Sequence, residues 1–251
     1  MPAPFDTLLF WLLAGIGVIL TGISKSGFAG GAGVVAVPLL AFAVPLPLAA
    51  VIMLPVLLFM DIRTIHLYRK HASLATLKHL VPAAFVGIAL GGSVMGMLST
   101  AALELITGVI SIVFASWQWI SSSLQRFQQA GWFWGTVSGV TSTLIHAGGP
   151  PINVYFLGRN LPKLQWLGTA AVLFGVMNLT KVIPYSLNGF WELRLLLVSV
   201  LLLPAAWLGV QLGHGIQQRI GGDTFTRICR VLLMISGAGL VVKGLFFTSV
   251  V

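Results

Sequence analysis

Long apolar stretches separated by short polar links dominate the pattern of the chain. A helix needs about 20 residues to cross the hydrocarbon core of a membrane, and most of these stretches reach or approach that length. The pattern predicts ten helical segments, at residues 7–24, 33–43, 47–66, 77–97, 101–120, 130–146, 150–158, 165–184, 194–213 and 224–247. The segments at 33–43 and 150–158 are too short to span a membrane alone, and each follows a glycine-rich break.

The apolar pattern also repeats about halfway along the chain. The sequence at 80–91 returns in similar form at 202–213, and the sequence at 59–62 returns at 176–179. Internal repeats in a membrane-embedded chain are typical of secondary transporters. We therefore expect an all-α polytopic membrane protein built from two five-segment repeats, each with a glycine-rich broken helix followed by a half-helix. The first repeat is predicted at residues 1–120, a linker at 121–129 and the second repeat at 130–251.

The charged residues of the links predict how the two repeats are oriented. The link after the third segment carries Arg63, Arg69, Lys70 and Lys78, whereas its counterpart at 185–192 has no Lys or Arg. Basic residues concentrate in cytoplasmic links, so the first link is predicted inside and the second outside. Five segments per half would then invert the second repeat relative to the first and place both termini outside.

Composition agrees with a membrane protein and limits the partners. Hydrophobic residues make up 57% of the chain and charged residues only 8%, which leaves too little polar surface for a soluble domain. The net charge is +9, but the 14 Lys and Arg residues are scattered between apolar segments instead of forming a nucleic-acid-binding cluster. We expect these basic residues to face lipid headgroups of the bilayer, and we expect no nucleic-acid partner.

The residues that commonly bind metals or form disulfides give no such indication here. Cys229 is the single cysteine, so an intramolecular disulfide is excluded. His66, His71 and His79 lie in the basic link without the helical spacing of metal ligands, which favours a solvated face. The sequence thus indicates no metal and no cofactor. The first apolar segment follows a start without Lys or Arg and without a convincing cleavage site, so we expect it to be retained.

The two glycine-rich breaks, at residues 24–33 and 146–153, are candidates for a binding site. Aligning Gly30-Gly31 with Gly148-Gly149 makes them the same element of the two halves, with Phe28 opposite His146. Irregular backbone at membrane depth is tolerated where it lines a cavity, and the N-termini of the following half-helices favour an anion. Pro150 and Pro151 suit the first turn of such a helix. Alternatively, the glycines only allow close packing of helices.

Ionisable and amide residues near the breaks extend this candidate site. Lys25 is the one charge between residues 7 and 60, which indicates function, unless its side chain only extends to a membrane interface. His146 is either a substrate or proton ligand or a packed neutral histidine. Asn178 and Lys181 are three positions apart, share a helix face and are expected to point inward. The candidate substrate-binding residues are Lys25, Ser26, Gly30, Gly31, Gly33, His146, Gly148, Gly149, Asn153, Asn178 and Lys181.

Asp61 occupies the position equivalent to Asn178 and is the candidate residue for coupling transport to an ion gradient. Its closeness in sequence to Arg63 and Arg69 favours instead a structural ion pair at the membrane edge. The sequence leaves proton coupling, sodium coupling and the absence of coupling all open.

These motifs resemble those of a known transporter family. The pattern Gly-x-x-Lys-x-Gly-Phe-x-Gly-Gly-x-Gly at 22–33, followed by Pro38, His-x-Gly-Gly-Pro at 146–150, Asn153, and the stretch at 168–181, is similar to the TauE/SafE sulfite exporter family, also called the toluene sulfonate uptake permease family. The resemblance spans essentially the whole chain. It implies transport of small sulfur-containing anions, such as sulfite, sulfonates or thiosulfate, across the bacterial inner membrane. From the two inverted halves we expect alternating access around a site near the membrane midplane.

Two functions of other classes remain as alternatives. An intramembrane serine hydrolase would use Ser24 or Ser26 as nucleophile with His146 as base. A non-transporting membrane scaffold would have dry, closely packed glycine breaks. The exact anion, the direction of transport and the oligomeric state are not set by the sequence.

Overall fold

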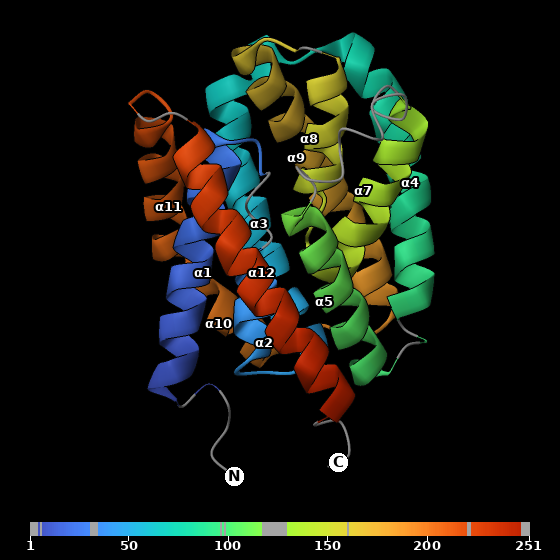
Figure 1. The fold of residues 1–251 in the computed structure, drawn as a ribbon, viewed down its shortest axis with the longest axis vertical. Helices are drawn as coiled ribbons and strands as arrows, with labels where there is room; N and C mark the ends of the chain where they lie inside the picture. Colours follow the sequence, from blue (N-terminus) through green and yellow to red (C-terminus); the bar gives the residue numbers. More distant parts are fainter. Residues whose placement is uncertain are drawn as a thin grey trace.

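The computed structural model describes residues 5, 7–30, 35–95, 97, 99–116, 130–159, 161–219 and 222–246, and within these ranges it contains helices and no strand (Figure 1). The helices in chain order are α1 (Leu8–Gly27), α2 (Ala36–Ala41), α3 (Leu46–Tyr68), η3 (Arg69–His71), α4 (Leu74–Met95), α5 (Thr100–Ala115), α7 (Gly131–Ile145), α8 (Gly149–Gly158), α9 (Lys163–Leu187), α10 (Leu193–Leu201), α11 (Leu203–Ile216) and α12 (Gly222–Phe246). The predicted all-α polytopic class is confirmed.

Helix α1 shows why these segments form helices in a bilayer. Thr7 caps its start by accepting a hydrogen bond from the main-chain N–H of Phe10 at 3.3 Å. Ala14 on one face is fully buried, whereas Leu12 and Ile16 on another face are 53% and 52% exposed. A helix that is apolar on both its buried and its exposed faces fits a lipid environment, because water would not solvate the exposed side.

Four helical segments of the described residues are long and apolar enough to cross a membrane: α1, α3 together with η3, α4 and α9. The pair α10 and α11 would make a fifth crossing, bent by 41° at its break. The sequence predicted one unbroken segment at 194–213, so the bend is a difference from the expectation. Leu202 separates the two helices, and Pro204, which lacks the N–H of a helix interior, lies in the first turn of α11.

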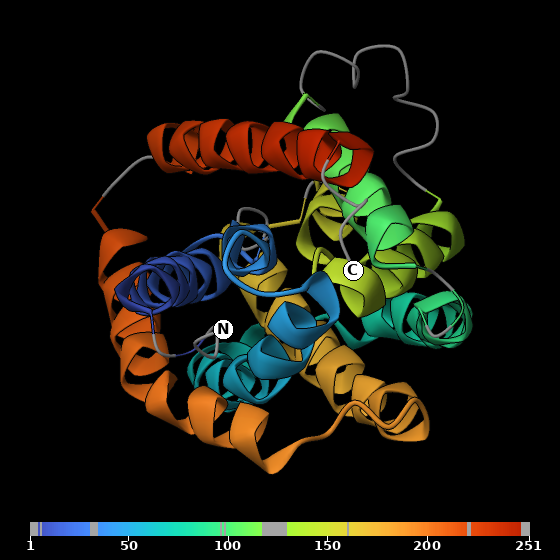
Figure 2. The same cartoon turned by 90° about the horizontal axis from the view of Figure 1, so that it is seen from below.

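The first helix of each half of the chain packs against a helix of the other half. Helix α1 packs along α11, and α7 packs along α4, while α3 contacts α9 and α5 contacts α12. Glycines allow this close approach: a Cβ atom on Gly22 would lie 2.8 Å from the main-chain carbon of Gly209, and one on Gly87 would lie 2.1 Å from the carbonyl oxygen of Thr136. In the view from below, α11 and α12 lie at the periphery of the bundle (Figure 2).

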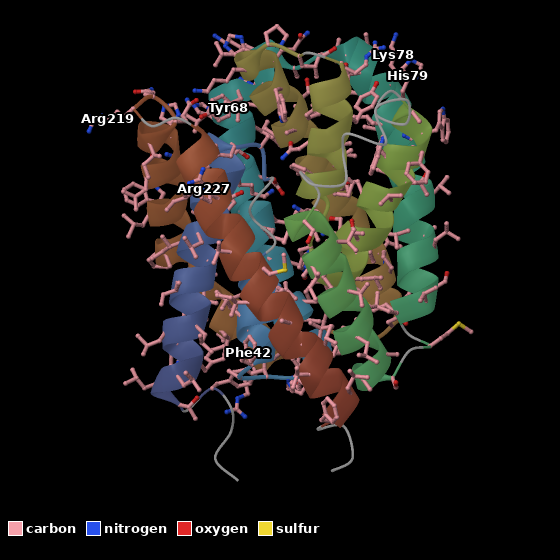
Figure 3. The ribbon with its side chains drawn as sticks, viewed as in Figure 1. Phe42, Tyr68, Lys78, His79, Arg219 and Arg227 are labelled. Atoms are coloured by element: carbon pink, nitrogen blue, oxygen red, sulfur yellow. The ribbon has the colours of Figure 1, made fainter. Side chains whose placement is uncertain are left out.

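The two ends of the bundle contain different helices and different charged residues. The first helix begins and α12 ends at the lower end of Figure 1, and α2 lies toward that end, whereas α8 lies toward the upper end. Figure 3 places Lys78, His79 and Arg219 at the upper end and Phe42 near the lower end. The basic link between α3 and α4 is therefore at the upper end.

Two expected boundaries changed. Helix α1 continues to Gly27 and so includes Lys25, although the sequence predicted its end at residue 24. Helix α2 begins only at Ala36 and has six residues. The predicted linker at 121–129 lies outside the described residues.

Candidate functional site

Both broken helices end in the same unusual backbone conformation. Ala29, after α1, has φ 52°, and His146, after α7, has φ 55°. A left-handed residue commonly terminates a helix, but residues other than glycine seldom adopt this conformation. At His146 the turn directs the ring toward α3, where Nε2 lies 2.8 Å from the carbonyl oxygen of Ala50.

A small cavity lies between the two breaks. Its volume is about 30 Å³, and its lining residues are Thr21, Lys25, Gly30, Leu57, Ser142, His146, Gly148, Gly149, Phe174 and Asn178. A cavity of this kind needs roughly 10–15 Å³ to hold one water molecule, so this one has room for about two. Helix α8 begins at Gly149, which lines the cavity, so the positive end of the helix dipole lies beside it. Pro150 and Pro151, the next two residues, carry no N–H.

The structure brings Lys25, Asp61 and Asn178 together in the interior. The Lys25 ammonium forms an ion pair with Oδ1 of Asp61, and the Asn178 amide donates a hydrogen bond to Oδ2. The side chains of Lys25 and Asp61 are only 8% and 3% exposed. The expected ion pair of Asp61 with Arg63 or Arg69 at the membrane edge is therefore wrong, because the carboxylate points inward to α1 and α9.

Lys181 forms a second buried network on the other side of the cavity lining. Its side chain is fully buried, and Nζ lies 3.0 Å from both the carbonyl oxygen and the hydroxyl oxygen of Ser142. Nζ also lies 2.7 Å from Nδ1 of His146. As expected, Asn178 and Lys181 both point inward from α9, with Asn178 4% exposed.

Four of the other predicted residues lie away from the cavity or outside the described residues. The Ser26 hydroxyl donates to the carbonyl oxygens of Gly22 and Val210, at 3.0 and 2.8 Å, and so joins α1 to α11. The side-chain oxygen Oδ1 of Asn153 accepts a hydrogen bond from the Trp166 indole at 2.8 Å. Gly31 and Gly33 lie outside the described residues.

The geometry does not form the serine–histidine pair of a hydrolase at Ser26. Its hydroxyl is bonded to two carbonyl oxygens, and both ring nitrogens of His146 are engaged by Ala50 and Lys181. The basic-link histidines His66, His71 and His79 are exposed. Among the described residues, no group of three His, Cys, Asp or Glu side chains could hold a metal ion.

Four lining residues were not predicted from the sequence: Thr21, Leu57, Ser142 and Phe174. Each precedes by four positions a residue that the sequence did single out, namely Lys25, Asp61, His146 and Asn178. Positions four apart lie on one face of a helix. Helical periodicity applied around each candidate residue would therefore have found all four.

The chain was also compared with known proteins. Residues 13–240 match the model of a family described as sulfite exporter TauE/SafE, which covers most of the chain. No curated protein matches, and no solved structure matches.

Proposed function

Because the chain belongs to the sulfite exporter TauE/SafE family, we propose that it is a secondary transporter of small sulfur-containing anions of the sulfite, sulfonate or thiosulfate class. Family membership by itself supports transport of an anion across a membrane. The class of anion, the use of the central cavity as the binding site and a location in the bacterial inner membrane belong to the proposal.

The observation that carries this proposal is the balance of ionisable groups around the cavity. Two lysines, Lys25 and Lys181, lie in or directly behind its lining, and Asp61 is the carboxylate that pairs with the first of them. Buried charges require counter-charges. With both lysines charged, the cluster is balanced when one further negative charge enters the cavity. The positive end of the α8 dipole favours the same sign.

The two breaks support alternating access because equivalent residues recur at one spacing. Ala29 and His146, which share the left-handed conformation, are 117 positions apart, and so are Asp61 and Asn178, which bond to each other. This spacing moves the expected alignment of the glycine pairs by one residue, so that the counterpart of His146 is Ala29 and not Phe28. Together with the positions of α2 and α8 toward opposite ends, it favours inverted repeats.

The size of the cavity indicates a closed conformation within this cycle. A sulfur oxyanion has at least four heavy atoms, whereas the present space suits one or two water molecules. Binding then requires the ends of α1 and α7 to move apart. The pair α1 and α11 would then move as one unit, and the pair α7 and α4 as another, because glycines hold the two helices of each pair in close contact.

Uptake into proteoliposomes tests the function directly. The purified protein is expected to transport radiolabelled sulfite, thiosulfate or taurine, and protein-free liposomes give the background. Transport of none of the three by folded protein would contradict the proposed substrate class.

A pair of valine variants tests the site. Gly149→Val places a side chain at the cavity and is expected to reduce transport at least tenfold, whereas Gly215→Val is a matched control because a Cβ there meets no atom within 4 Å. Both variants are checked for folding by size-exclusion chromatography. Wild-type transport by folded Gly149→Val would move the site away from the cavity.

A further inference from the structure

Lys181 is a buried basic side chain that has no carboxylate partner in the part of the chain that the structure describes. Its three N–H donors are matched by three neutral acceptors: the carbonyl and hydroxyl oxygens of Ser142 and Nδ1 of His146. Asp61 has both oxygens engaged already, by Lys25 and by Asn178. A fully buried ammonium without a counter-ion is costly, so the charge of Lys181 depends on an anion that comes from outside the protein.

The hydrogen bonds of His146 limit how many protons Lys181 and His146 can hold together. Nε2 of His146 faces the carbonyl oxygen of Ala50 at 2.8 Å, and because a carbonyl only accepts hydrogen bonds, Nε2 carries a hydrogen. Nδ1 then faces Lys181 Nζ at 2.7 Å. If both groups were charged, two N–H donors would point at each other. The pair is therefore either neutral or carries one positive charge.

We propose that the pair Lys181 and His146 is the proton-loading site of the transporter: it is neutral while the cavity is empty and takes one proton from solution when a monovalent anion binds. This inference rests on the proposed function. The proton resides on Lys181 Nζ, which donates to Nδ1 of His146, and it leaves again when the anion leaves on the other side. One monovalent anion thus crosses with one proton, and no net charge is moved.

The position of the pair explains how it responds to the anion. Ser142 and His146, its direct contacts, line the cavity, so an anion there lies one side chain from Lys181 Nζ. The other charged groups that face the cluster are Lys25 on α1 and Asp61 on α3, and these two neutralise each other. Tyr185 on α9 packs its ring 6.1 Å from the His146 ring and carries no charge. The incoming anion and the proton on the pair are then the two charges that balance each other.

Proton uptake on binding provides the test. Methanesulfonate is the probe, because it is monovalent and does not titrate near neutral pH. Purified wild-type protein in weak buffer with an indicator dye is expected to take up about one proton per bound anion, and its apparent Kd is expected to rise about tenfold per pH unit above neutrality. Calorimetry measures the bound anion independently.

The matched variants are Lys181→Met, which removes the titrating amine, and Lys70→Met at an exposed lysine of η3. Lys181→Met is expected to bind methanesulfonate without proton uptake and with a Kd independent of pH, whereas Lys70→Met behaves like wild type. Unchanged proton uptake in Lys181→Met would place the proton on a group other than Lys181 and overturn the proposal.

A second measurement needs only the wild-type protein. In proteoliposomes, an imposed pH gradient is expected to drive methanesulfonate accumulation on the alkaline side, without a membrane potential. Methanesulfonate binding with no proton uptake and no response to the gradient would overturn this inference alone. Failure of folded protein to bind methanesulfonate, thiosulfate or sulfite would contradict the proposed function itself.

Discussion

Tyr68 and Tyr185, which lie 117 positions apart, form the same hydrogen bond in the two halves. The Tyr68 hydroxyl donates to the carbonyl oxygen of Ser26 at 2.8 Å, and the Tyr185 hydroxyl donates to that of Thr143 at 2.9 Å. In both cases the acceptor is 42 positions earlier, in the last turn of a broken helix. Carbonyl groups there lack a partner within their helix, so each tyrosine fastens one broken end to the third helix of its own half.

Removal of either hydroxyl should loosen one end of the site. Tyr68→Phe and Tyr185→Phe each leave a buried carbonyl without this partner, which costs about 1–3 kcal/mol. We expect both variants to fold with a lower melting temperature and to expose the cavity from opposite ends. Thiol labelling of Thr21→Cys, in a Cys229→Ser background, measures this exposure from each side of the membrane, and Tyr155→Phe on α8 is the control. Equal labelling from the same side in both variants would show that the tyrosines do not close opposite ends.

Variants of the ion pair between Lys25 and Asp61 distinguish an effect on folding from an effect on transport. Lys25→Ala leaves the Asp61 carboxylate buried without a cation, and breaking a buried pair from one side costs about 3–5 kcal/mol. The double variant Lys25→Met/Asp61→Asn removes both charges and is expected to recover most of the melting temperature. It should still transport more slowly than wild type in proteoliposome uptake, because Lys25 is the ammonium in the cavity lining and Lys181 reaches the cavity only through Ser142 and His146. Uptake at the wild-type rate by the double variant would mean that Lys25 has only a structural role.

Two glycines of α1 should respond very differently to the same substitution. A Cβ atom on Gly22 would press on the main chain of Gly209 and Val210 at 2.8 Å, whereas one on Gly15 meets no atom within 4 Å. Main-chain atoms cannot rotate away, so Gly22→Ala forces α1 and α11 apart and is expected to lower the free energy of unfolding by roughly 1–3 kcal/mol. Gly15→Ala should be neutral. Thermal unfolding in detergent checks both, and equal melting temperatures would contradict the close contact.

The orientation of the chain can be tested with two exposed positions. Lys70 lies in the basic link at η3, and Asn188 follows α9 in the link that has no Lys or Arg. Single cysteines at Lys70 and Asn188 are expected to react with a membrane-impermeant reagent from opposite sides, Asn188→Cys from outside. The Cys229→Ser parent gives the background. Labelling of both from one side would contradict the inverted arrangement.

The helices were largely predictable because apolar length and glycine breaks are local properties of the sequence. The bend between α10 and α11 was not, although it has a local signal in Pro204. The same Leu-x-Pro-Ala-Ala pattern at 80–84 lies within the unbroken helix α4, so the local sequence does not decide between a bend and a continuous helix.

The site was predictable as a set of residues but not as a set of contacts. Asp61 and Arg63 are two positions apart and thus point to different faces of α3, which explains why their expected pairing failed. The contact of Lys181 with Ser142 and His146 joins α9 to the end of α7, and nothing in the local sequence of either segment specifies the other. Such contacts follow from the packing of whole helices.

The contact of α1 with α11 has a consequence for biogenesis. Residues 8–27 are synthesised well before their packing partner at 203–216. During that interval the small-residue face of α1 lies against lipid or a membrane chaperone. Long-range pairing of this kind makes assembly slow compared with insertion. Neither half can therefore mature as an independent module, and the bundle is complete only after residues 203–216 have been synthesised.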